Sequence, residues 1–176
     1  EEQEDLERIG GAGVAYDKND AKVQLVNVHD RPGIVAALFS GLAEQSISVD
    51  MIIQSPSRKG DNTTDVTFTV PKTDLPRCKG FIEQSARELG AASVEYDTDI
   101  VKVSIVGLGM RSHAGVAAKM FELLSEENIN IHAISTSEIK ISCIIEAKYV
   151  ELAVRALHAG FGLDRAPGAS SPPPAG

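Results

Sequence analysis

The residues of this 176-residue chain that are best suited to chemistry lie in two short turns of similar sequence. Residues 29–35 read HDRPGIV, and residues 110–116 read MRSHAGV. In the first turn Asp30 fits a helix N-cap, Pro32 fits a first helical turn, and Gly33 permits close approach to the backbone. A helix start has unpaired N–H groups and partial positive charge, so each turn is suited to hold a carboxylate. The alternative is that these residues only cap a helix.

A second group of polar residues is predicted at strand ends. Asp50 and Gln54 lie on or just beyond one strand-like segment, and we take Asn130 and Ile131 as their counterparts in the second half. A carboxylate and an amide can hold an ammonium group and a hydroxyl or amine through charge-assisted hydrogen bonds. The alternative is that these are ordinary strand ends with polar residues in solvent.

Other reactive residue types form no recognisable site. The GGAG segment at residues 10–13 has no lysine nearby and no βαβ context, so a nucleotide loop is not predicted. No pair of histidines has metal-ligand spacing with carboxylates, and neither cysteine shows a low-pKa signature. The residues concerned are His29, His113, His132, His158, Cys78 and Cys143. We therefore predict no catalytic residue, no metal and no cofactor.

An internal repeat indicates which elements position the two turns. Residues 14–28 (VAYDKNDAKVQLVNV) resemble residues 94–108 (VEYDTDIVKVSIVGL), and the match continues from residues 32–52 into residues 114–134. Gly33 matches Gly115, Phe39 matches Phe121, and Ile47 matches Ile129. The chain therefore contains two copies of one folding unit.

Apolar periodicity predicts the same elements in both copies, in the order strand, helix, strand, strand, helix. Strands are expected at residues 21–28, 48–53 and 65–70, and at 101–107, 130–135 and 139–145. Helices are expected around residues 35–42, 75–89, 116–124 and 148–159. Residues 92–97 can close the first sheet, whereas the second copy lacks a closing strand unless residues 13–17 supply it. This predicts an α+β chain of two ferredoxin-like βαββαβ domains, with the first inserted in the second.

The expected domain boundaries follow from this arrangement. Residues 21–98 form the first domain, and residues 13–20 with 99–163 form the discontinuous second domain. Residues 1–12 are expected to be a flexible N-terminus. Residues 164–176, a tract rich in proline, serine and glycine, are expected to be a disordered tail.

The charge, apolar runs and cysteine count of the chain argue against several classes of function. A net charge of −8 gives little electrostatic support for a nucleic-acid or anionic membrane partner. No apolar run approaches the roughly 20 residues that cross a bilayer, and two cysteines are too few for a disulfide scaffold. We expect a soluble protein of the reducing cytoplasm.

Four segments closely resemble the C-terminal tandem ACT domains of bacterial aspartokinases (aspartate kinases), and the likeness extends over residues 13–163. They are VDMIIQS (49–55), NTTDVTFTVPKTDL (62–75), KVSIVGLGMRSHAGVAAKMFE (102–122) and INIHAISTSEIKIS (129–142). The resemblance implies feedback inhibition of aspartate kinase through binding of L-lysine, L-threonine or both. It also implies a homodimer formed through ACT domains, and a catalytic domain or subunit as partner. The Lys-x-Gly-Gly segment that opens the family's catalytic domain is absent here, so the chain alone is expected to be regulatory and inactive.

The resemblance also implies a set of effector-binding residues. Carried over by position, these are Asp30, Gly33, Ile34, Val35, Ser48, Val49, Asp50, Gln54, Val116, Ala117, Asn130, Ile131, Ser137 and Glu138. Backbone N–H groups near residues 33–35 and 130–131 would bind the effector carboxylate, and acidic side chains would bind its ammonium group. Ser55 stands where the family often has asparagine, and the loop at residues 56–61 differs, so the effector preference stays open.

Two other functions remain as alternatives, and a nucleic-acid-binding role is set aside. A free-standing double-ACT sensor could regulate some other protein. A nucleic-acid-binding ferredoxin-like module would need strand aromatics, but aromatic residues make up only 5% of this acidic chain. A small enzyme on the same fold has no nucleophile or base constellation to support it.

Overall fold

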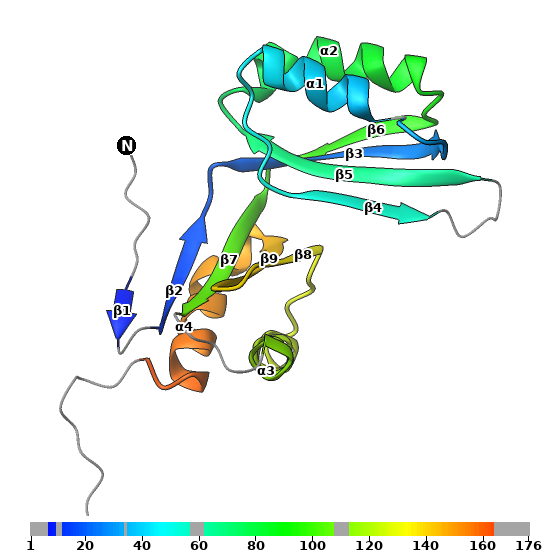
Figure 1. The fold of residues 1–176 in the computed structure, drawn as a ribbon. Helices are drawn as coiled ribbons and strands as arrows, with labels where there is room; N and C mark the ends of the chain where they lie inside the picture. The colour runs from blue at the N-terminus through cyan, green and yellow to red at the C-terminus, as the bar shows by residue number, and fades with distance from the viewer. Residues whose placement is uncertain (1–6, 10–11, 34, 57–61, 108–112, 164–176) are drawn as a thin grey trace, which may run out of the picture. The chain divides into compact units, whose positions relative to one another are not determined.

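The computed structural model describes residues 7–9, 12–33, 35–56, 62–107 and 113–163 (Figure 1). The chain forms two compact units: Lys18–Val101, and Glu1–Asp17 together with Lys102–Gly176. The insertion of one unit within the other is therefore visible in how the chain divides. No helix among the described residues is long and apolar enough to span a bilayer.

The inserted unit, Lys18–Val101, contains a four-stranded sheet and two helices. Its elements are β3 (Asp20–His29), α1 (Ala36–Glu44), β4 (Ile52–Pro56), β5 (Thr63–Pro71), α2 (Leu75–Glu88) and β6 (Ser93–Asp97). The strand order is β4-β5-β3-β6, and each neighbouring pair is antiparallel. Both helices cover one face of the sheet (Figure 1). The core between these layers contains the fully buried Leu25, Leu38, Leu42, Phe68 and Ile82.

The second unit repeats this arrangement, except that the strand equivalent to β6 comes from the start of the chain as β2 (Ala12–Asp17). Its elements are β1 (Glu7–Ile9), β2 (Ala12–Asp17), β7 (Ile100–Gly107), α3 (His113–Glu126), β8 (Ala133–Thr136), β9 (Lys140–Glu146), η1 (Ala147–Tyr149) and α4 (Val150–Gly160). The strand order is β1-β2-β7-β9-β8, and β2 pairs antiparallel with β7. The predicted α+β class, with two ferredoxin-like domains and the first inserted in the second, is confirmed.

The ends of the chain add one element that the sequence did not predict. Glu7–Ile9 form strand β1 beside β2, within the segment expected to be flexible. Ala12 of the same segment begins β2, whereas residues 1–6 and 10–11 and the predicted tail at 164–176 lie outside the described residues. The inserted unit, Lys18–Val101, extends three residues beyond each end of the predicted first domain.

The second strand of each copy begins later than its periodicity predicts, at Ile52 rather than residue 48 and at Ala133 rather than residue 130. The cause is the way the preceding helix ends. Ser46 takes a left-handed conformation with φ 57°, and the Ile47 N–H donates back to the Leu42 carbonyl at 2.9 Å. Hydrogen bonds of this kind define a Schellman cap, which uses the residues just after the helix before a ladder can form.

Candidate functional site

The first predicted turn follows strand β3 directly. The Asp30 N–H donates to the Asn62 carbonyl at 2.7 Å, which holds the turn against the loop before β5. Gly33 has φ 73°, and its carbonyl accepts the Ala36 N–H at 3.1 Å. This left-handed position suits glycine because it lacks a Cβ. The turn is therefore fixed by backbone hydrogen bonds at both ends.

The predicted capping role of Asp30 is wrong. Helix α1 begins at Ala36, its N-cap is Val35, and no side chain makes a capping hydrogen bond. Pro32 likewise precedes the helix instead of lying in its first turn. The reason is that the Asp30 backbone pairs with Asn62, which delays the helix by several residues. The exposed Asp30 side chain is consequently not used as a cap.

The structure places part of the predicted first-copy set near this turn. Gln54 is exposed at the middle of edge strand β4, opposite Val66, which pairs in turn with Leu25 midway along β3. Val35 is half-buried against the core, and Ile34 lies outside the described residues. Asp30 and the start of α1 thus lie at one end of the sheet, and Gln54 lies midway along its β4 edge.

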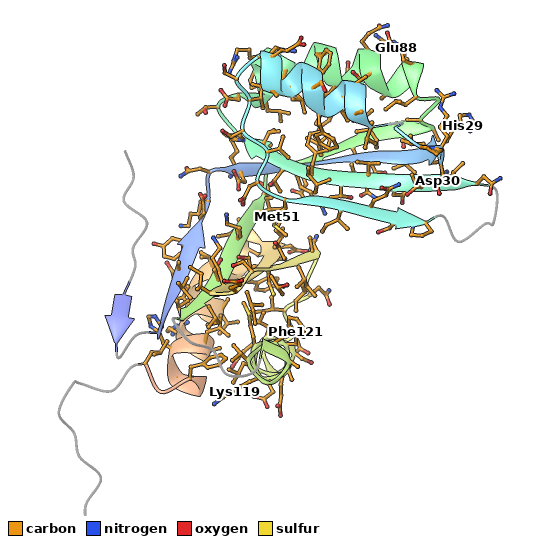
Figure 2. All side chains as sticks on the ribbon, in the orientation of Figure 1. His29, Asp30, Met51, Glu88, Lys119 and Phe121 are labelled. Atoms are coloured by element: carbon orange, nitrogen blue, oxygen red, sulfur yellow. The ribbon has the colours of Figure 1, made fainter. Side chains whose placement is uncertain are left out.

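The rest of the first-copy set lies at the opposite end of the sheet. The Asp50 N–H donates to the Thr69 carbonyl at 3.3 Å, and Thr69 pairs with Lys22 near the start of β3. Ser48 and Val49 precede Asp50 in the same loop. Figure 2 shows Asp30 at one end of the sheet and Met51, the neighbour of Asp50, at the other. Within this unit, Asp30 and Asp50 are not brought together.

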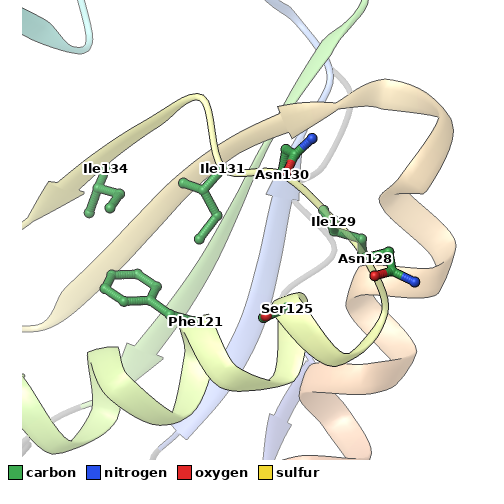
Figure 3. A pocket seen from close by; sticks show the side chains of 7 residues that line it. All are labelled: Phe121, Ser125, Asn128, Ile129, Asn130, Ile131 and Ile134. Carbon is green, nitrogen blue, oxygen red and sulfur yellow. The ribbon is translucent and has the colours of Figure 1, made fainter.

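The second unit contains a pocket of about 600 Å³ between α3, the loop that follows it and strand β8. Its lining residues are uncharged: Phe121, Ser125, Asn128, Ile129, Asn130, Ile131 and Ile134. Phe121 points from α3 toward Ile131 and Ile134, while the amide groups of Asn128 and Asn130 point away from them (Figure 3). The pocket therefore has an apolar side and a polar rim.

Two predicted residues, Asn130 and Ile131, belong to this pocket. Within the part of the chain that the structure describes, no group accepts a hydrogen bond from either backbone N–H. Backbone N–H groups without a protein partner are available to an acceptor such as water or a ligand carboxylate. This is the role that the family resemblance implies for this segment.

The other predicted second-copy residues lie elsewhere in the unit. Val116 and Ala117 are half-buried in the early part of α3, and Ser137 and Glu138 are exposed in the β8–β9 turn. The Gly107 N–H donates to the Ile139 carbonyl at 2.9 Å, which places that turn beside the end of β7. Strand β8 separates this group from Asn130 and Ile131. The predicted set is therefore divided in each copy.

The proposed counterpart relation between the copies also needs correction. Asn128 has φ 56°, and the Ile129 N–H donates to the Leu124 carbonyl at 3.0 Å, which repeats the cap at Ser46 and Ile47. This register makes His132 the counterpart of Asp50. Asn130 and Ile131 instead correspond to Ser48 and Val49.

Sequence reasoning missed five pocket residues: Phe121, Ser125, Asn128, Ile129 and Ile134. The repeat matches Phe121 with Phe39 and Ile129 with Ile47, but a match between copies does not indicate which of the paired positions lines a pocket. Phe39 does pack edge-on against Phe68, with ring centroids 5.4 Å apart. The position of Phe68 is taken in the second copy by the smaller Cys143, so Phe121 has no such ring partner there.

The described residues contain no group of three or more histidine, cysteine or acidic side chains placed to hold a metal ion. Burial raises the pKa of the Cys143 thiol to about 12, and the pKa of Cys78 is raised mainly for the same reason. A raised pKa disfavours the reactive thiolate, so both cysteines fit structural positions.

Two family models described as ACT domain match residues 24–77 and 103–161. The two units are therefore ACT domains.

Solved structures define the family more narrowly. A structure of aspartokinase alpha and beta subunits is 48% identical with a TM-score of 0.77, and the match covers 85% of this chain and 97% of that one. The ligand-free regulatory subunit of aspartate kinase from Thermus thermophilus is 42% identical with a TM-score of 0.78, covering 84% and 96%. The chain belongs to the aspartate kinase family and is homologous to its regulatory part. The aspartate kinase of Pseudomonas putida is 49% identical over 164 residues, which are 93% of this chain and 39% of that protein.

Proposed function

We propose that this chain is the allosteric regulatory part of an aspartate kinase, and that it binds L-lysine, L-threonine or both for feedback inhibition. The observation that carries the proposal is the match to a solved regulatory subunit, 96% of whose length is covered by this chain. Its partner would be a catalytic aspartate kinase domain or subunit in the cytoplasm. Phosphorylation of aspartate would take place there and not in this chain.

The chemistry of the two candidate sites supports an amino-acid ligand. The unbonded N–H groups of Asn130 and Ile131 suit a carboxylate, and the apolar side of the pocket suits the carbon atoms of a side chain. In the inserted unit, the exposed Asp30 carboxylate suits an ammonium group, and Gln54 suits a hydroxyl or amine.

Calorimetric titration with lysine and with threonine tests the proposal. Asp30→Ala and Gln54→Ala should each weaken the binding of at least one amino acid by about tenfold to a hundredfold, because a charge-assisted contact is worth about 1.5–3 kcal/mol. Asp99→Ala is a matched control, since it removes another exposed aspartate outside the predicted set. Absence of binding to both amino acids in the parent protein would contradict the proposal.

Catalytic inactivity of the chain alone is tested separately. Purified protein should give no aspartate-dependent ATP turnover, because the family's phosphate-binding segment is missing from this sequence. Activity that persists through repeated purification, and in the Asp30→Ala variant, would show that the chain has a catalytic site of its own.

A further inference from the structure

Strand β3 contains an irregularity just before the first turn. Leu25 pairs with Val66 and Val28 pairs with Thr64, so β3 carries one residue more than β5 across this interval. The extra residue forms a β-bulge, a feature that is enriched beside functional sites because it re-aims a strand. Asn27 lies within it and has φ 54°, which few residues other than glycine and asparagine adopt readily.

The bulge sets the orientation of the residues that come after it in the chain. Side chains alternate between the faces of a strand, so one added residue exchanges the faces of all later positions. Val28 is fully buried as a result. His29 and Asp30 come immediately afterwards and begin the turn of the candidate site.

One carboxylate holds the bulge in place. The Asn27 N–H donates to Asp65 Oδ1 at 2.9 Å, and Gln24 Nε2 donates to Asp65 Oδ2 at 3.4 Å. Asp65 lies on β5 and pairs across the other side with Ser55, the neighbour of Gln54. The same residue therefore connects the strand that leads to Asp30 with the strand that carries Gln54.

The second copy has no carboxylate at the corresponding position. Gly107 matches Asn27 in the repeat, and its N–H donates to the backbone carbonyl of Ile139 at 2.9 Å. Lys140 stands at the position that corresponds to Asp65. Of the two copies, only the first has a carboxylate that accepts a hydrogen bond from the strand at this point.

We propose that Asp65 is a positioning residue for the ligand site: through the bulge at Asn27 it fixes the direction of the turn that carries Asp30 and Gly33. The ligand-binding half of this inference rests on the proposed function. The conformational half stands on the hydrogen bonds alone.

Hydrogen exchange of individual amides tests the conformational half. In Asp65→Ala, the amides of Asn27 and Asp30 should exchange at least tenfold faster, because each bond opens without global unfolding. Asp65→Asn is the conservative variant and should stay near the parent, since its Oδ1 can still accept the Asn27 N–H. Asn27→Val should loosen the same amides, because a β-branched residue is strained at positive φ.

Thr69→Val provides a matched structural control. Thr69 lies on the same strand, and its hydroxyl accepts the Met51 N–H at 3.1 Å at the opposite end of the sheet. Loss of this hydrogen bond should lower the stability of the unit without selectively speeding exchange of the Asp30 amide. If the Asp30 amide exchanges as slowly in Asp65→Ala as in Thr69→Val, the positioning role is wrong.

Calorimetry on the same variants tests the binding half. Asp65→Ala should weaken amino-acid binding by about tenfold if the correctly placed turn becomes a minor state of about 10%, while Asp65→Asn and Thr69→Val should not. Unchanged affinity in Asp65→Ala would overturn this half. If the parent binds neither amino acid, the proposed function fails, and the exchange experiment still decides whether Asp65 positions the turn.

Discussion

At the scale of single residues, the two copies use corresponding positions in different ways. Phe68 is fully buried in the first sheet, and the smaller Cys143 takes its position in the second. The Cys143 Sγ lies 3.9 Å from Met120 Sδ, so two polarisable sulfur atoms occupy this part of the core. Burial raises the pKa of this thiol to about 12 from its ordinary value of 9.0.

This raised pKa predicts a loss of stability in alkaline solution. Below about pH 9 the thiol is protonated in both the folded and the unfolded protein, so it contributes no pH dependence. As the pH rises from about 9 to about 12, the unfolded chain loses this proton and the folded chain keeps it, which favours unfolding. Between pH 8 and pH 10, the free energy of unfolding should fall by roughly 1 kcal/mol more in the parent than in Cys143→Ala. Urea unfolding at both pH values measures this difference, and equal losses in the two proteins would contradict it.

At the scale of elements, the structure shows where residue patterns were sufficient and where they were not. Strand β3 and helix α2 lie close to their predicted ranges, because their apolar residues repeat clearly at the strand and helix periods. The late starts of β4 and β8 could not be predicted from periodicity, because apolar spacing does not reveal the left-handed cap residues Ser46 and Asn128 that delay each strand. Sequence spacing also could not separate Asp30 from Asp50, since only the strand pairing places them at opposite ends of a sheet.

Two helical glycines of the inserted unit illustrate the same limit. A Cβ added to Gly41 in α1 would overlap the ring of Phe81 on α2, whereas one added to Gly80 in α2 would meet nothing within 4 Å. Phe81 is partly buried and packs against the core, so moving its ring away from Gly41 would disturb that packing. Nothing in the residue pattern around either glycine indicates this difference.

We therefore expect opposite effects from one substitution at the two sites. Gly41→Ala should destabilise the protein by about 1–3 kcal/mol, because the added methyl overpacks the interface between the helices. Gly80→Ala should stabilise it by about 0.5–1 kcal/mol, since alanine is the better helix former. Thermal or urea unfolding of both variants provides the comparison. A stabilised Gly41→Ala variant would show that Phe81 can move away at little cost.

At the scale of the whole molecule, the repeat was enough to predict the insertion of one ferredoxin-like domain in the other. The physical reason is that a second copy without its closing strand leaves a sheet edge unpaired, and the strand at residues 13–17 was the matching segment available. Each finished sheet still has edge strands, among them β4 and β8. Edge strands expose backbone groups that can pair with another chain.

The last prediction concerns assembly through these edges. Ile52 on β4 is 55% exposed and Ile134 on β8 is 43% exposed, and the two occupy corresponding positions in the repeat. Large apolar side chains on an open edge favour contact with a second copy, and burying one contributes about 1.5–3 kcal/mol. We expect the parent to form at least a dimer. Ile52→Lys should weaken that dimer by more than about tenfold, because a charged side chain would have to be desolvated at the contact.

Ile139→Lys is the matched control, because Ile139 is 46% exposed but lies in the turn between β8 and β9. Light scattering over a range of protein concentrations, with and without amino acid, measures the outcome. A parent that stays monomeric at high concentration would contradict the dimer, and an Ile52→Lys variant that dimerises as well as the parent would place the interface away from β4.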